Sequence, residues 1–382
     1  MLYTSTITPP LKIGLQILGV WPDTPYNTFH RLIYMSIMLA VYYFQQLYII
    51  TNWKVSEFED LVGYLTMVLY YLLTILKLTI LWMNRRIIRE LLSAIDTDWR
   101  EGVKIDQHLQ LMRAKATNSQ FCTIALLGVD LGASIIYFGG ENVAAIMHSM
   151  DDDNYTSRPF PLKVSLPSGA QQSPLYELLV VFLFIHAMLT VYTVDIITAF
   201  ISALICHVSG QFDIIYYELR TLSVKISYNE SKFTIKMLIE KHNKVIEFAN
   251  NVEKLYSVII FMQVFPNTTV MCLMAVVSLY GDDDVGLAQG SIGYITLAAE
   301  IFVYCFMGEH LGIKSRSLAD AGYDCLWYNM SPSYSRNILL IILRSQKQLT
   351  MTAGGVINLS LEAFTSIMKA SASYISVLHA TI

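Results

Sequence analysis

The final stretch of the chain, residues 352–382, has the side chains whose spacing most clearly suggests a function. Small and polar residues recur there at intervals of three and four, so a helix would bring them onto one face. A membrane helix with such a stripe needs another helix or water along it. Two interpretations therefore remain open, the wall of a pore or a tightly packed helix seam. In the pore interpretation, which we adopt, the lining residues are Ser366, Lys369, Ser373, Ser376, Val377, His379 and Ala380.

The sequence contains no motif for catalysis. It has no Gly-rich phosphate loop, no Gly-x-Ser-x-Gly and no His-Glu-x-x-His. The five cysteines are not at metal-ligand spacing. The eight histidines are scattered, and a lone histidine in an apolar stretch, such as His186, is more often a hydrogen-bonded packing residue. We therefore predict that the protein is not an enzyme and has no cofactor, metal or nucleic acid partner.

A few ionisable residues interrupt the apolar stretches: Lys77, Asp130, Asp195, Glu300 and Lys369. Such residues face a bundle interior or water when they lie inside a membrane. They are too few and too dispersed for a proton relay, which makes a transporter the weaker alternative. Asp195 and Glu300 are also consistent with positions near helix ends that continue into the cytosol.

Aromatic and polarisable residues predict a ligand pocket in the outer half of the bundle. They lie on helical faces of several apolar stretches, and small residues between 121 and 147 leave room between the helices. For any one of these residues, ordinary packing is the competing interpretation. The predicted pocket residues are Met67, Tyr70, Tyr71, Thr74, Gly132, Ile135, Ile136, Met188, Tyr192, Tyr294 and Leu297.

The amino-acid composition indicates the class of protein to which these residues belong. Hydrophobic residues make up 54% of the 382 and charged residues only 15%, against about 25% charged in soluble domains. We predict an all-α integral membrane protein, a single unit over residues 1–382 with helical polar segments between its spans. The seven predicted transmembrane helices cover about 32–50, 61–83, 121–147, 175–205, 256–280, 292–311 and 352–381.

Basic residues predict the orientation of the spans. Of the 26 lysines and arginines, 21 fall in the N-terminal tail and in the loops after the second, fourth and sixth spans, against 3 in the other loops. Positive loops stay in the cytosol, so the N-terminus should be cytosolic and the C-terminus extracellular. This is the reverse of a G-protein-coupled receptor. It also places Asn154, which begins a glycosylation sequon, outside the cell.

Three segments resemble insect odorant receptors. Phe302–Leu311 is similar to the sixth-helix signature of that family, and Ser317–Tyr328 to the segment that follows it. Leu359–Tyr374 is similar to its seventh helix. Related gustatory receptors end in Thr-Tyr, five apolar residues and Gln-Phe, whereas this chain has Ala380-Thr381 in the last two places. The departure favours an odorant receptor, and an odorant-specific one, because the co-receptor keeps the glutamine.

The resemblance implies a tuning subunit of a ligand-gated, non-selective cation channel. It implies a heterotetramer with odorant receptor co-receptor subunits, an anchor domain of packed cytosolic helices, and a pore lined by the seventh helix. It further implies a pocket for a small apolar or volatile odorant, and a place in the plasma membrane of the olfactory neuron dendrite. The alternatives are a homomeric channel like the gustatory receptors and, less favoured, a G-protein-coupled-type receptor or a transporter.

Overall fold

The computed structural model describes residues 5–22, 27–52, 58–151, 160–222, 228–280, 284–325 and 327–381, and nearly all of them are helical. The α-helices are α1 (Pro9–Ile17), α2 (Asn27–Asn52), α3 (Phe58–Met83), α4 (Arg85–Gly102), α5 (Asp106–Asp151), α6 (Leu175–Leu222), α7 (Tyr228–Tyr280), α8 (Asp284–Asp324), α9 (Pro332–Gln346) and α10 (Leu361–Thr381). Two short 3-10 helices and a two-stranded sheet, β1 (Thr352–Ala353) and β2 (Ile357–Asn358), complete the described elements.

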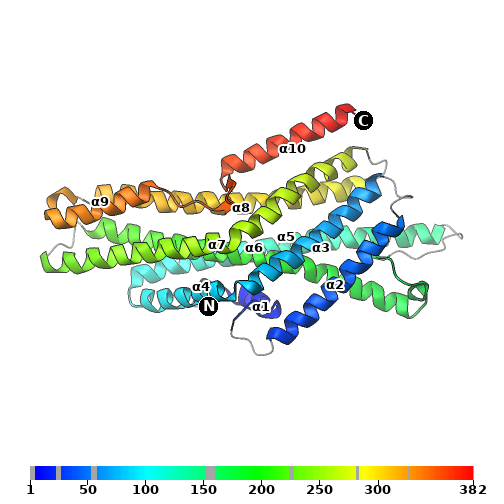
Figure 1. Ribbon diagram of the computed structural model, residues 1–382, viewed down its shortest axis with the longest axis horizontal. Coiled ribbons are helices and arrows are strands. Elements are labelled where there is room, and N and C mark those ends of the chain that lie inside the picture. Colours follow the sequence, from blue (N-terminus) through cyan, green and yellow to red (C-terminus); the bar gives the residue numbers. More distant parts are fainter. Residues whose placement is uncertain are drawn as a thin grey trace.

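The long helices form an elongated bundle. α5, α6, α7 and α8 run along its length, α2 and α3 lean against one end, and α9 lies at the other (Figure 1). By length and composition, six described segments can cross a membrane: Thr28–Asn52, Gly63–Met83, Asp106–Gly139, Leu175–Leu222, Thr234–Ala275 and Gly290–Asp324. α10 corresponds to the seventh predicted span and packs against α7 and α8 at the edge of the bundle.

Four helices continue well beyond the predicted spans. α6 runs on to Leu222, and α7 begins at Tyr228, almost thirty residues before the apolar stretch that predicted it. The reason is visible in the sequence of α6, where Val208, Phe212 and Leu219 are fully buried in the main core. Apolar residues at this spacing keep one face of the helix packed after the apolar span has ended. The polar segments between spans therefore extend the same bundle.

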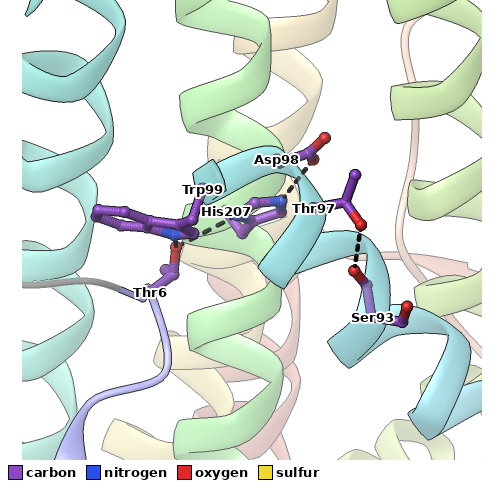
Figure 2. Close-up of polar contacts among 6 residues, drawn as sticks. All are labelled: Thr6, Ser93, Thr97, Asp98, Trp99 and His207. Atoms are coloured by element: carbon purple, nitrogen blue, oxygen red, sulfur yellow. Dashed lines mark hydrogen bonds and ion pairs between the residues drawn. The ribbon is translucent and has the colours of Figure 1, made fainter. Parts of the chain in front are cut away.

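The N-terminal segment is held between α4 and α6. The hydroxyl of Thr6 accepts a hydrogen bond from Trp99 Nε1 at 2.9 Å and lies 3.2 Å from His207 Nδ1. The other ring nitrogen of His207 lies 3.0 Å from Asp98 Oδ2. Figure 2 shows this chain of contacts, with Thr6 between the Trp99 and His207 rings and Asp98 beyond. These four side chains thus hold the N-terminal segment against α4 and α6.

The seventh helix begins nine residues later than the predicted span. Gly354 and Gly355 have φ values of 63° and 72°, which a glycine adopts without strain, and they turn β1 back onto β2. The Glu253 carboxylate accepts a hydrogen bond from the Thr352 amide at 3.0 Å and another from its hydroxyl. α10 then starts after Ser360, whose Oγ accepts from the Ala363 amide at 3.1 Å.

α8 passes very close to the residue that leads into α10. A Cβ atom at Gly308 would lie 2.6 Å from the Cβ of Leu359, and closer still to its carbonyl oxygen. Only a glycine lets the two backbones approach in this way. The position of α10 relative to α8 therefore depends on the missing side chain of Gly308.

We predict that Gly308→Ala destabilises the protein, by about 1–3 kcal/mol in the free energy of unfolding, because the added methyl overpacks this contact. Thermal unfolding of the purified chain in detergent measures the effect. Gly128→Ala on α5 is the matched control, since a Cβ there meets nothing within 4 Å. Equal midpoints for the two variants would contradict the assigned role of Gly308.

Candidate functional site

A cavity lies between the helices in the half of the bundle that includes α2 and α3. Its volume is about 170 Å³, close to the roughly 150 Å³ cavity that holds benzene in another protein. Five helices contribute to its wall, together with Leu162 from the segment before α6. The lining residues are Thr66, Met67, Tyr70, Tyr71, Asp130, Ala133, Ser134, Tyr137, Phe138, Leu162, Ala187, Thr190, Val191, Val194, Asp195, Met274, Ile292, Gly293, Thr296, Leu297 and Glu300.

Four of the predicted ligand residues line this cavity: Met67, Tyr70, Tyr71 and Leu297. The first three occupy one face of α3, and Leu297 faces them from α8. Tyr71 is itself fixed from behind, since its hydroxyl lies 3.1 Å from His186 Nδ1 and the two rings stack at an interplanar angle of 9°. His186 is thus a hydrogen-bonded packing residue, as the sequence indicated.

The other seven predicted ligand residues lie elsewhere. Thr74 is fully buried and donates its hydroxyl to the Tyr70 carbonyl at 2.8 Å. Ile135 and Ile136 are exposed on the outer side of α5. Met188 packs in a small core cluster with Tyr71, and Tyr192 packs against the main core. Gly132 and Tyr294 belong to cavity-forming helices and are not among the lining residues.

Three acidic residues that the pocket prediction left out also line the cavity: Asp130, Asp195 and Glu300. The signal that identifies them is an ionisable residue inside an apolar stretch. For Asp195 and Glu300, the alternative of span ends that continue into the cytosol stays a prediction. Both lie well inside α6 and α8, where they are only 3% and 9% exposed.

The surroundings of Glu300 join two helices at the cavity. Its Oε2 accepts hydrogen bonds from the side-chain amides of Gln263 and Asn267 on α7, the latter at 2.8 Å. All three side chains are buried. Lys77 of α3 is also buried, at 1% exposed, and interacts electrostatically with Glu300 and Asp195. The cavity therefore has an apolar, aromatic wall and a polar end.

The described part of the predicted pore face is exposed. Ser366, Lys369, Ser373 and Ser376 all point away from the rest of the chain on α10. The Ser373 and Ser376 hydroxyls each donate to a carbonyl one turn back at 2.9 Å, so they are satisfied within the helix. The side chains of Val377, His379 and Ala380 lie outside the described residues, as does Asn154.

The opposite face of α10 holds the helix on the bundle. Phe364 and Ile367 pack against the main core, and Ser371 is fully buried with its Oγ 3.5 Å from Cys272 Sγ. The Phe364 ring meets Phe302 of α8 edge to face, with 5.4 Å between ring centroids. The polar stripe therefore does not pack against any described helix of its own chain.

Sequence comparison links the chain to odorant receptors. The model of the 7tm Odorant receptor family matches residues 57–372. Odorant receptor 22c of Drosophila melanogaster is 28% identical over 231 residues, which is 57% of each chain. Odorant receptor 10 of Aedes albopictus is 23% identical over 383 residues and 97% of each chain. The odorant receptor coreceptor of Aedes aegypti is 26% identical over 145 residues, 38% of this chain and 30% of the relative.

A solved structure shares the fold. The insect olfactory receptor OR5 from Machilis hrabei, in complex with eugenol, superposes with a TM-score of 0.81 at 13% identity. The match covers 98% of this chain and 97% of that one. It confirms the all-helical, multi-pass membrane fold predicted from the sequence. Because the family model extends over most of the chain, the protein belongs to the 7tm odorant receptor family.

Proposed function

We propose that the chain is the odorant-binding subunit of a ligand-gated, non-selective cation channel in the plasma membrane of olfactory neuron dendrites. The cavity between α3, α5, α6, α7 and α8 carries this proposal, because it has the size of a small volatile molecule and a largely apolar wall. A relative of the same fold was solved with eugenol, itself a small aromatic molecule. Relatives among the co-receptors support assembly with co-receptor subunits into a heterotetramer.

In this proposal the charged end of the bundle is the cytosolic anchor. α4, α9 and the extended parts of α5 to α8 meet there, and their ion pairs join different helices. Asp213 of α6 binds Lys115 of α5 at 3.0 Å and Lys314 of α8 at 2.7 Å. Helices joined by ion pairs in this way suit a domain that stays rigid while the cavity end of the bundle responds to ligand.

α8 links the proposed odorant cavity to the proposed pore helix. Residues Ile292 to Glu300 contribute to the cavity wall, and Phe302 meets Phe364 of α10 half a turn further on. A ligand that displaces α8 would therefore displace α10 through this aromatic contact. The exposed stripe of α10 faces water or a partner subunit in the assembled channel, and its movement would widen the pore.

Odorant-evoked current in cells that express the chain together with a co-receptor tests the function. We expect Tyr70→Ala to raise the half-maximal odorant concentration by about threefold or more, because a ring of the cavity wall is lost. Ile136→Ala is the matched control, since Ile136 is exposed outside the cavity. Equal shifts in both variants would remove the cavity from odorant binding, and current without any co-receptor would indicate a homomeric channel.

Orientation has its own test. An epitope after Ile382 should be stained on intact cells, whereas an epitope before Met1 should need permeabilised cells, because the basic segments keep the N-terminus inside. The opposite staining pattern would return the protein to the orientation of G-protein-coupled receptors.

The pore face of α10 can be probed with introduced cysteines. Ser373→Cys and Ser376→Cys should react with a charged, water-soluble thiol reagent and change the current, more so with odorant present. Ile367→Cys is the control on the same helix, because Ile367 packs against the core. Functional channels in which all three sites are inert would show that water does not reach the stripe.

A further inference from the structure

Three carboxyl groups close one end of the cavity. Among the lining residues, Asp195 is the last that α6 contributes and Glu300 the last that α8 contributes. α5 runs in the opposite direction, and Asp130 is the first residue it contributes. The three acids therefore meet at the same end, whereas Met67, Phe138 and Leu297 belong to the apolar remainder.

Two of these acids present oxygens that have no partner. Glu300 Oε1 and Asp195 Oδ2 are both buried without a hydrogen bond, and both residues are at least nine-tenths buried. The amides of Gln263 and Asn267 reach only the other Glu300 oxygen. Burying a hydrogen-bond acceptor without a donor costs free energy. A ligand that donates a hydrogen bond to these oxygens is therefore favoured over an empty, dry cavity.

Acidic groups predominate at this end of the cavity. The carboxyl groups of Asp130, Asp195 and Glu300 all line it. Lys77 is a basic side chain that interacts electrostatically with Glu300 and Asp195. Because three acids face one such base, a cationic ligand group matches this end better than an anionic one.

We propose that this cavity takes a small amine in its protonated form, with the ammonium group against Glu300 and Asp195 and the hydrocarbon part against the aromatic wall. The inference rests on the proposed function, because it names the ligand class of the same odorant site. A primary amine is protonated near neutral pH, and its ammonium group offers three donors to the unpartnered oxygens. Met67, Phe138 and Leu297 border the space that the hydrocarbon part fills.

An organic cation suits this cavity better than a metal ion does. Within the part of the chain that the structure describes, no group of three or more His, Cys, Asp or Glu side chains could hold a metal. The cavity volume of about 170 Å³ also exceeds what a bare ion fills. A benzene ring with a one-carbon amine head matches both the size and the polarity.

The arrangement discriminates between head groups. An aldehyde or ketone offers only an acceptor, which would face carboxylate lone pairs without a donor between them. An alcohol donates one neutral hydrogen bond, and an ammonium group donates charge-assisted bonds that are stronger. The expected order of potency is therefore amine, then alcohol, then carbonyl compound.

A series with a constant ring tests this order. Currents are recorded from the chain co-expressed with co-receptor subunits, in response to benzylamine, benzyl alcohol, benzaldehyde and toluene. We expect benzylamine to act at concentrations at least about tenfold lower than benzaldehyde and toluene. Equal or greater potency of benzaldehyde would overturn the proposal.

Variants that each replace one carboxylate by an amide test which residues bind the amine. Glu300→Gln and Asp195→Asn should raise the half-maximal concentration of benzylamine by at least about tenfold, and that of benzyl alcohol by less than about threefold. Asp324→Asn is the control, because Asp324 is an exposed residue in a 3.7 Å surface pair with Arg220. Unchanged benzylamine potency in both cavity variants, with surface expression intact, would overturn the assignment. If the cavity variants do not reach the surface, the potency order of the unmodified chain decides.

Thermal shift of the purified full chain separates this inference from the channel proposal. Stabilisation by benzylamine and not by benzaldehyde, without any evoked current, would support the amine site and overturn the proposed channel function. Currents evoked by other odorants, with no preference for benzylamine in either assay, would overturn the amine site alone. Absence of a shift and of a current with all four compounds would also overturn it.

Discussion

The hydrogen bonds around Glu300 are the constraint on which the membrane part of the fold most depends. An unpaired acidic group inside a bilayer is costly, and such groups turn toward a bundle interior where donors are available. α7 supplies the donors, Gln263 and Asn267, from one face of a helix that also contains Pro266. These contacts fix α7 and α8 relative to each other at the level of the cavity.

The two ends of the bundle differ in how their buried polar groups are satisfied. At the charged end, carboxylates and lysines pair across helices, as Asp213 does with Lys115 and Lys314. His108 of α5 lies 2.7 Å from the Glu218 carboxylate of α6 in the same region. At the cavity end the acids outnumber the bases, and oxygens of Asp195 and Glu300 remain without partners. In the proposed function, this pattern corresponds to a self-contained scaffold at one end and a ligand site at the other.

The sequence was sufficient to predict the helical class, the number of spans and the face of α3 that lines the cavity. These features depend on hydropathy and helical period, which are local properties. It was insufficient for Tyr192 and Met188, because the side of α6 that faces the cavity is decided by contacts with α1 and α3. A Cβ at Gly14 of α1 would lie 2.9 Å from the Tyr192 hydroxyl, so the N-terminal segment already occupies that side.

The start of α10 shows a second limit. Residues 352–360 were predicted as the start of the helix, yet the diglycine turn and the Glu253 carboxylate hold them as a hairpin. The carbonyl of Ser257 also accepts a hydrogen bond from the Gly354 amide at 2.9 Å. Both partners, Glu253 and Ser257, lie on α7, far from the hairpin in the sequence. The hairpin anchors the base of α10 to α7 and α8, while the described residues of the polar stripe, Ser366, Lys369, Ser373 and Ser376, are exposed. Beyond this base, Phe364 meets Phe302 of α8, and Ser371 lies against Cys272 of α7. In the proposed channel, a shift of α8 at the cavity would reach α10 through these packed side chains.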